Sequence, residues 1–292
     1  MEIRKAERKK AKLRLGIAAP SGAGKTYSAL LLAFGLGGKV GLIDTEHGSG
    51  DLYAHLGDYD IIGIEAPYTV AKYLQAIKAF EQAGYNVVII DSLSHAWAGD
   101  GGLLDKQGKI ADSGKQNGFA AWRTITPEHN SLVEAMLRSP CHIIATMRAK
   151  QEYVLETGAN GKQTPKKVGL APVQRDGMEY EFTVMLDVDM NHVASASKDR
   201  TGLFDGAYFK VTPETGTKLL GWLDTGTPPE VFDDAVFEGN QVAMLDASTL
   251  DELQAAFAVA YKYAKRFNDA EALTAATTVY NGRKAELTEE HA

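Results

Sequence analysis

Apolar runs and stretches of helical periodicity alternate through the first two thirds of the chain. The apolar runs are rich in β-branched residues and short enough to be buried strands. The alternation predicts an α/β domain with a mostly parallel central sheet and right-handed crossovers. The predicted strands are residues 13–18, 40–43, 60–64, 87–90 and 142–146, and the predicted helices are residues 27–36, 69–83 and 120–137.

The pattern changes near residue 180. Short strand-like runs at 180–187, 192–197 and 207–211 follow one another closely, and Met190-Asn191 forms a turn signal between the first two. We therefore expect antiparallel strands that extend the parallel sheet.

The remaining residues predict a separate helical part. Residues 224–247 are rich in Pro, Gly, Asp and Glu and show little periodicity, which indicates a linker. Residues 249–287 have the spacing of a helical hairpin, with a capping signal at Ser248 and an expected stop or interruption at Asn281-Gly282. The predicted organisation is a basic N-terminal segment 1–12, a core 13–223, an acidic linker 224–247 and a C-terminal helical domain 248–292.

Composition excludes several classes of protein. The chain has 292 residues, of which 45% are hydrophobic and 24% charged, so it is long enough for one large and one small domain and too apolar to be disordered throughout. It has no apolar run long enough to span a membrane, and its charged N-terminus lacks the apolar segment of a secretory signal. The single cysteine, Cys141, excludes an intrachain disulfide and suits a buried position. We expect a cytoplasmic protein without a membrane partner.

Charge is unevenly distributed along the chain. The net charge is −7, and residues 228–292 carry an excess of acids that accounts for it. The rest of the chain is neutral on average and contains basic stretches, one of them at the N-terminus. The negative net charge of the whole chain therefore does not exclude binding of polyanions at these basic stretches.

The clearest chemical motif lies between the first predicted strand and the first predicted helix. It matches the phosphate-loop pattern G-x-x-x-x-G-K-[ST], with Ala19 in place of the leading glycine. Glycines let backbone N–H groups converge on phosphates, the lysine neutralises the β- and γ-phosphates, and the threonine is a ligand for Mg²⁺. The flanking strand and helix favour a nucleotide site over a glycine-rich turn. The expected binding residues are Ala19, Pro20, Ser21, Gly22, Ala23, Gly24, Lys25 and Thr26.

Asp91 supplies a second acidic signal at the end of the 87–90 strand. A carboxylate at the carboxyl end of a buried parallel strand faces the crevice where a nucleotide lies. We expect Asp91 to hold Mg²⁺ together with Thr26.

The order of the motifs resembles the ATPase core of RecA-like recombinases. The phosphate loop is followed by Ile-Asp-Thr-Glu-His at 43–47 and by Val-Ile-Ile-Asp-Ser at 88–92, and the resemblance covers about residues 10–222. It implies that Glu46 is the general base, that Asp44 is a structural carboxylate beside it, and that Thr146 senses the γ-phosphate. The chain is also similar to phage-encoded ATP-binding proteins of the AAA type that act in recombination or single-strand annealing.

The same resemblance implies a contribution from a neighbouring subunit. RecA-like filaments place a Lys-x-Lys pair at the end of a late strand, where it reaches the γ-phosphate of the adjacent protomer. Lys198 and Arg200 have this spacing and would lie on one face of a strand.

RecA-like proteins have two DNA-binding loops, each of which follows a central strand. The corresponding strands of this chain are those that end at Asp91 and at Thr146. The corresponding loop positions are residues 99–118 and 148–175, which we expect to be mobile loops of positive charge. The candidate DNA-binding residues are Lys106, Lys109, Lys115, Arg148, Lys150, Lys162, Lys166, Lys167 and Arg175.

The motifs thus predict an ATPase that uses ATP and Mg²⁺, and the resemblance implies that it binds single-stranded DNA and acts in recombination, annealing or repair. The resemblance implies a homo-oligomer or filament with ATP at subunit interfaces, and the C-terminal helices offer a site for a protein partner. Two alternatives stay open: a P-loop helicase or helicase loader in replication, and a kinase of a nucleotide or small molecule. Whichever molecule stimulates ATP turnover would discriminate among them.

Overall fold

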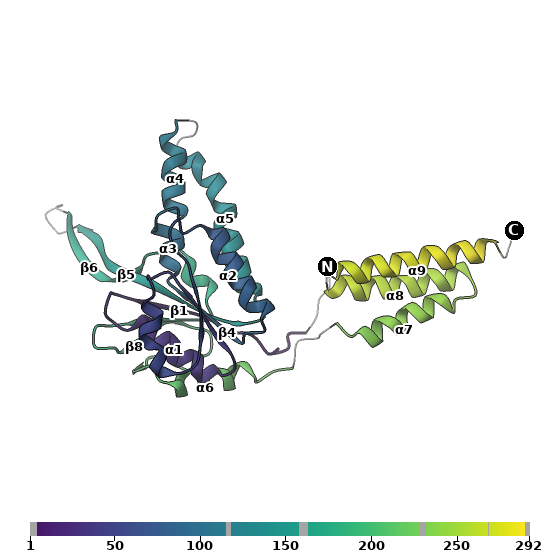
Figure 1. The fold of residues 1–292 in the computed structure, drawn as a ribbon, viewed down its shortest axis with the longest axis horizontal. Coiled ribbons are helices and arrows are strands. Elements are labelled where there is room, and N and C mark those ends of the chain that lie inside the picture. Colours follow the sequence, from purple (N-terminus) through teal and green to yellow (C-terminus); the bar gives the residue numbers. More distant parts are fainter. Residues whose placement is uncertain (1–4, 115–117, 158–162, 228–231, 268, 290–292) are drawn as a thin grey trace. The chain divides into compact units, whose positions relative to one another are not determined.

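The described residues of the first unit, Met1–Thr227, form a nine-stranded sheet (Figure 1). The computed structural model describes residues 5–114, 118–157, 163–227, 232–267 and 269–289. The strand order is β3-β2-β4-β5-β1-β7-β8-β9, and β6 pairs with β5 off this path. The strands are β1 Arg14–Ala19, β2 Val40–Asp44, β3 Asp60–Gly63, β4 Val87–Asp91, β5 His142–Thr157, β6 Gln163–Pro172, β7 Val184–Val188, β8 Ala194–Asp199 and β9 Tyr208–Phe209.

The sheet is parallel from β3 to β7. Strand β1 pairs in parallel with both β5 and β7, and β4 pairs in parallel with β2 and β5. Strands β7, β8 and β9 are antiparallel to one another. The predicted α/β fold with a mostly parallel sheet and an antiparallel extension is therefore confirmed. The parallel strands place their carboxyl ends at one edge, where a crevice for ligands forms.

Helices cover both faces of the sheet, which explains the unbroken apolar strands. In β4, Val88 and Ile90 pack in one core cluster with residues of α2, α3 and α5, whereas Val87 and Ile89 pack in the other with residues of α1 and α6. The helices of this unit are α1 Lys25–Leu36, α2 Val70–Gln82, α3 Leu93–Ala98, α4 Leu103–Asp112, α5 Gly118–Arg138 and α6 Pro213–Leu223, with 3₁₀ helices η1 Ser49–Leu56 and η2 Met178–Glu181.

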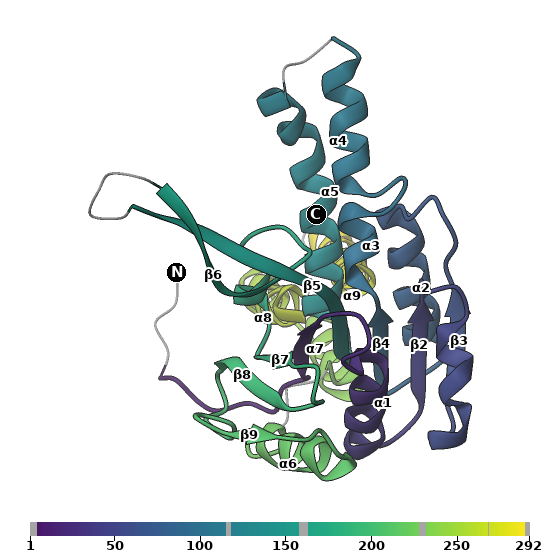
Figure 2. The ribbon, with the colours of Figure 1, turned by 90° about the vertical axis from the view of Figure 1, so that its left-hand side faces the viewer.

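The structure corrects the expectation of a mobile loop at 99–118. Helix α4 occupies most of this segment and α5 begins at Gly118, so the two helices project from the sheet together (Figure 2). The Asp105 carboxylate accepts hydrogen bonds from Gly101 N and from Lys109 one turn later, and Leu103 is buried. Gly99, Gly101 and Gly102 precede α4, whereas Gly108 lies inside the helix without ending it.

The expectation of a loop at 148–175 is also wrong. Strand β5 continues past Thr146 to Thr157 and pairs with β6 in an antiparallel hairpin that leaves the sheet (Figure 2). The apolar run at 142–146 marks only the part of β5 that is buried on both faces. Beyond it, polar and β-branched residues form a strand with one partner, and this composition shows no continuous apolar signal.

The antiparallel part is shorter than predicted. Tyr180 lies in η2, so the strand expected from residue 180 begins at Val184, and the strand expected at 207–211 is limited to Tyr208–Phe209. Helix α6 follows and was not predicted. Its N-terminus has a capping box between Thr212 and Thr215.

The second unit, Pro228–Ala292, consists of helices in its described part. These are α7 Asp234–Leu245, α8 Leu250–Phe267 and α9 Ala270–Glu289. Helix α7 lies within the segment expected to be a linker. A helix forms there because Asp233 caps its N-terminus and because Phe237 and Met244 are buried. Helix α9 continues through Asn281-Gly282 because Leu287 beyond them is buried.

The described part of the basic N-terminal segment is bound to the end of α6. Lys9 forms a β-bridge with Thr227, and the Lys10 ammonium pairs with Asp224 at 3.2 Å. This segment precedes β1, so it lies at the edge of the sheet opposite the phosphate loop. None of the described helices combines the length and the apolar character that crossing a membrane requires.

Candidate functional site

The phosphate loop connects the carboxyl end of β1 to the first residue of α1. Gly22 and Gly24 have φ values of 81° and 86°, a left-handed conformation that glycine adopts without a Cβ clash. Ala19 is the buried last residue of β1 and pairs with Arg148 of β5, so a leading glycine is not required there. Because α1 begins at Lys25, the free N–H groups of its first turn border the loop and favour an anion.

Lys25 lies partly buried within this loop. Its Nζ donates a hydrogen bond to the Pro20 carbonyl at 3.2 Å. Burial lowers the pKa of Lys25, while the charges of Asp91 and Glu46 act in the opposite direction. The two carboxylates thus help to keep an ammonium group at the place where phosphates would bind.

Asp91 is the buried end of β4 and lies between two threonine hydroxyls. Thr26 Oγ1 donates to one carboxylate oxygen at 2.5 Å, and Thr146 Oγ1 donates to the other. Burial raises the pKa of Asp91, whereas the two hydroxyl hydrogen bonds lower it. The structure therefore brings together Thr26 and Asp91, the two predicted magnesium ligands, and adds Thr146 to the same cluster.

This cluster fits a magnesium ion that is shared with a nucleotide. A hydroxyl and a carboxylate are oxygen ligands, which Mg²⁺ prefers, and Mg²⁺ is usually held by few protein groups together with phosphates and water. Among the described residues, no group of three or more His, Cys, Asp or Glu side chains could hold a metal ion by itself. Thr26 and Asp91 would hold the ion, which when bound neutralises negative charge on phosphate oxygens.

Glu46 follows β2 and is held from two directions. The Asp44 carboxylate accepts hydrogen bonds from Glu46 N at 2.6 Å and Gly50 N at 3.0 Å, which shapes the turn. The Glu46 carboxylate itself pairs with Arg148, whose Nε and Nη2 donate to its two oxygens at 3.0 and 2.6 Å. Burial alone would raise the pKa of Glu46, but the hydrogen bonds and charge of Arg148 keep it below its ordinary value.

His95 of α3 joins the turn after β2 to the end of β4, and no role for it follows from the sequence. Its Nδ1 lies 2.7 Å from Thr45 Oγ1, which accepts a hydrogen bond from Ser92 N at 2.9 Å. The imidazole stacks on the ring of Tyr68 with centroids 4.7 Å apart. Burial lowers the pKa of His95, which favours a neutral ring. No local motif could have identified His95, because its partners come from distant segments.

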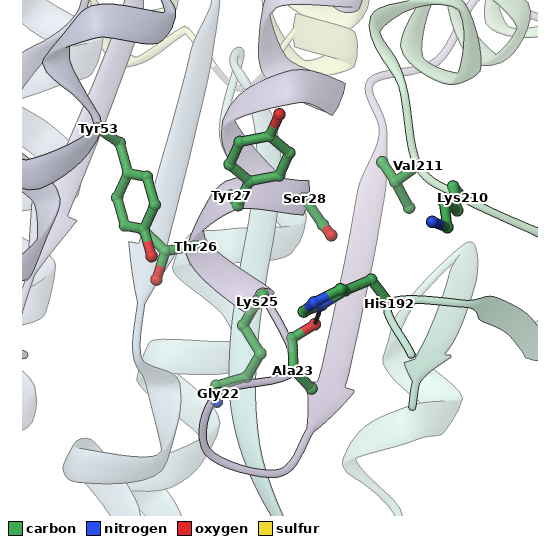
Figure 3. A pocket seen from close by; sticks show the side chains of 11 residues that line it. Gly22, Ala23, Lys25, Thr26, Tyr27, Ser28, Tyr53, His192, Lys210 and Val211 are labelled. Carbon is green, nitrogen blue, oxygen red and sulfur yellow. Dashed lines mark hydrogen bonds between the residues drawn. The ribbon is translucent and has the colours of Figure 1, made fainter. Parts of the chain in front are cut away.

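A cavity of about 510 Å³ adjoins the phosphate loop (Figure 3). Tyr27 of α1 and Tyr53 of η1 line one side with their rings 6.2 Å apart, and His192 lies on the other with Nδ1 3.1 Å from the Ala23 carbonyl. Lys210 and Val211 complete this side of the cavity. Apart from Tyr27, these residues are distant from the loop in sequence, so spacing gave no signal for them.

A family model described as an AAA domain matches residues 11–218. The chain belongs to the AAA domain family. The match runs from the residues before β1 into α6, so it contains the phosphate loop, Glu46, Asp91 and Thr146 and excludes the second unit. AAA domains are P-loop ATPases, which agrees with the nucleotide site described above. The comparison with curated proteins gave no match.

Lys198 and Arg200 of the AAA domain share a main-chain partner. Lys198 Nζ and Arg200 Nη2 donate to the Tyr180 carbonyl of η2 at 2.6 and 3.0 Å. The described residues that line the cavity in Figure 3 include neither of them. The structure thus brings the pair together at η2, and their action on a neighbouring nucleotide stays a prediction.

Four of the candidate DNA-binding cations in the described part of the AAA domain are engaged within the chain, and one of them is Arg148 in its ion pair with Glu46. Lys106 pairs with Glu128, and Lys109 pairs with Asp105 at 2.6 Å. Arg175 donates to Thr126 Oγ1 at 3.2 Å, and its guanidinium lies 5.8 Å from the Trp122 ring centre. Lys106 and Lys109 are on α4, whereas Arg175 follows β6, so the candidates come from two separate projections.

The other candidates belong mostly to the hairpin. Lys150 is exposed on β5, shortly after Arg148, and Lys166 and Lys167 are in β6. The two remaining candidates, Lys115 and Lys162, lie outside the described residues.

Proposed function

We propose that this AAA domain protein is an ATPase that binds single-stranded DNA and acts in DNA recombination, annealing or repair. The observation that carries the proposal is the path of β5. Its buried half provides Thr146, which donates a hydrogen bond to Asp91 in the nucleotide site, and the same strand continues into the β5–β6 hairpin. One strand therefore links the site of ATP hydrolysis to a projecting element with a basic sequence.

The nucleotide site supports hydrolysis of ATP. Lys25 binds the β- and γ-phosphates, and Asp91, oriented by Thr146, fixes the position of Thr26. Glu46 is the carboxylate proposed to accept a proton from the attacking water. The bond between the γ-phosphorus and the ADP oxygen then breaks, and the charge of Lys25 lies beside the departing ADP.

Charge in the hairpin supports a nucleic-acid strand as the partner. Residues 148–175, the hairpin with its flanking residues, contain six basic and two acidic residues in a chain whose net charge is negative, and of the six Arg148 and Arg175 are engaged within the chain. An extended hairpin can present such charges along a phosphate backbone, and binding of this kind does not depend on base sequence.

The rate of ATP turnover with and without a single-stranded oligonucleotide tests the proposal. We expect the oligonucleotide to increase the rate, and a duplex of equal length serves as a comparison. A rate that responds instead to a small phosphoryl acceptor, with transfer of the γ-phosphate to it, would identify a kinase. A response only to a partner helicase would identify a loader.

Replacing Lys162, Lys166 and Lys167 by alanine is expected to weaken binding of single-stranded DNA and to reduce its salt dependence. Each lost phosphate contact lowers the log–log slope of affinity against salt by about 0.7 for single strands. The measurement is a salt titration of binding to a fluorescent oligonucleotide, with ATP affinity expected to be unchanged. Replacing Lys262, Lys265 and Lys284 by alanine removes the same charge from the second unit and is the matched control. Unchanged affinity and slope in the hairpin variant would exclude these lysines from DNA binding.

Arg200→Ala is expected to abolish ATP hydrolysis while the altered subunit still binds ATP, because Arg200 is proposed to act on the nucleotide of a neighbour. Mixing this variant with Lys25→Ala protein should restore part of the activity, since mixed interfaces combine one intact loop with one intact arginine. Activity is measured over a range of mixing ratios, and assembly is checked by light scattering. Assembled mixtures without activity at any ratio would argue against action between subunits.

A further inference from the structure

The ion pair between Glu46 and Arg148 engages both oxygens of the proposed base. The guanidinium donates from Nε and Nη2 in a two-point contact, at 3.0 and 2.6 Å. The Glu46 side chain is 23% exposed and that of Arg148 48%, so the pair is only partly screened by water. Such a contact fixes both the orientation and the charge environment of the carboxylate.

The main chain of Arg148 lies where β5 leaves the central sheet. Arg148 is paired with Ala19, the last residue of β1, and the next residue, Ala149, is paired with Pro172 of β6. Arg148 N donates to Ser94 Oγ at 2.9 Å, and the Arg148 carbonyl accepts from Val173 N at 2.6 Å. A displacement at the base of the hairpin therefore moves the residue that holds Glu46.

Other charged and titratable groups surround Glu46, but their effects partly oppose one another. Lys25 and Asp91 carry opposite charges, and each interacts electrostatically with Glu46. Arg148 makes the two-point contact with it. Arg148 lowers the pKa of Glu46, and a carboxylate with a lowered pKa is a weaker base for the attacking water. The groups facing Glu46 are Arg148 from β5, Lys25 from α1, Asp91 from β4, His95 from α3 and Tyr73 from α2.

We propose that Arg148 is a positioning residue that restrains Glu46 in a resting arrangement, and that a strand bound on the β5–β6 hairpin opens the ion pair. The inference rests on the proposed role of Glu46. Once released, Glu46 takes one proton from water while the water oxygen bonds to the γ-phosphorus and the bond from that phosphorus to the ADP oxygen breaks. Arg148 takes no part in these bonds, so it acts on the reaction only through Glu46.

Steady-state ATP hydrolysis by the full chain tests the restraint, with Arg148→Gln and Arg148→Lys compared with the parent. We expect Arg148→Gln to raise kcat about fivefold without oligonucleotide, to leave KM unchanged and to lose most of the stimulation by saturating single-stranded oligonucleotide. Arg148→Lys keeps the charge without the two-point contact and should give an intermediate kcat. Arg138→Gln removes an exposed arginine that pairs with Glu134 on α5, and it should match the parent.

A kcat for Arg148→Gln at or below that of the parent, with KM unchanged, would overturn the restraint. Thermal unfolding shows whether each variant is folded. If Arg148→Gln is not folded, the kcat of Arg148→Lys decides whether Arg148 restrains Glu46. In a second possible outcome, the oligonucleotide leaves the hydrolysis rate of the parent unchanged and Arg148→Gln is faster than the parent. This result supports the restraint of Glu46. It overturns both release by a bound strand and the proposed DNA function. A parent that responds, combined with an Arg148→Gln variant of equal basal rate and equal stimulation, contradicts the restraint and leaves the DNA function standing.

Discussion

Lys25→Ala should weaken the binding of ATP by at least about a hundredfold, which is the expected loss of charge-assisted hydrogen bonds to phosphates. The Lys25 ammonium is held within the loop by the Pro20 carbonyl and lies near two carboxylates that favour its charged form. Alanine removes the charge that offsets the negative phosphates and leaves Asp91 and Glu46 to repel them. Equilibrium binding of a fluorescent ATP analogue measures the effect.

The matched control for this variant is Lys78→Ala, which removes an exposed lysine from α2. It should bind the analogue like the parent. Thermal unfolding establishes that Lys25→Ala is folded, because the side chain is partly buried. Equal affinities in the parent and in folded Lys25→Ala protein would show that the loop does not bind the phosphates through this residue.

Glu46→Gln should retain ATP binding and lose hydrolysis by a factor of about 10²–10⁴, the usual contribution of a general base. Glutamine keeps the size of the side chain and the Glu46 backbone hydrogen bond to Asp44, but its amide cannot accept the proton of the attacking water. The measurement is a single-turnover hydrolysis assay with bound ATP, which separates binding from chemistry.

Glu65→Gln is the control for Glu46→Gln, because it neutralises an exposed carboxylate in the segment after β3. It should hydrolyse ATP at the rate of the parent. Hydrolysis by Glu46→Gln at that rate would mean that another group, or water alone, accepts the proton. The restraint proposed for Arg148 would then have no reaction to act upon.

The parts of the site that could be predicted from sequence are those in which a short segment determines both conformation and chemistry. The phosphate loop needs glycines at Gly22 and Gly24 for its backbone and a lysine and a threonine directly after them. Asp91 follows an apolar run whose burial on both faces requires a parallel sheet. Because parallel strands end at one edge, the proximity of Asp91 to Thr26 followed from the fold class.

The parts that could not be predicted depend on contacts between distant segments. His95 meets Thr45 across 50 positions of the chain, and His192 meets Ala23 across 169. Arg148 is a basic residue in a basic segment, which favours a role as a phosphate ligand, whereas in the folded chain it forms an ion pair with the proposed base. A composition argument identifies the charge of a residue but not its partner.

The errors in secondary structure have a related cause. Glycines near α4 and acids around α7 favour loops by local propensity, but both helices are stabilised by specific contacts. Asp233 caps α7, and the burial of Phe237 holds that helix against its neighbours. Tertiary packing of this kind overrides local propensity, so Gly282 lies inside α9 despite its cost in a helix.

Strand β5 lies between β4 and β1 up to Ala145, pairs with β1 alone as far as Arg148, and pairs with β6 alone beyond it. Its first half is buried in the core, so its amides become accessible only when the whole sheet opens. Its second half shares hydrogen bonds with β6 alone and can separate from it while the sheet stays intact. One continuous strand therefore crosses the boundary between two cooperative units of unfolding. The hairpin can fray, remodel or be clipped by a protease at little cost to the stability of the nucleotide site.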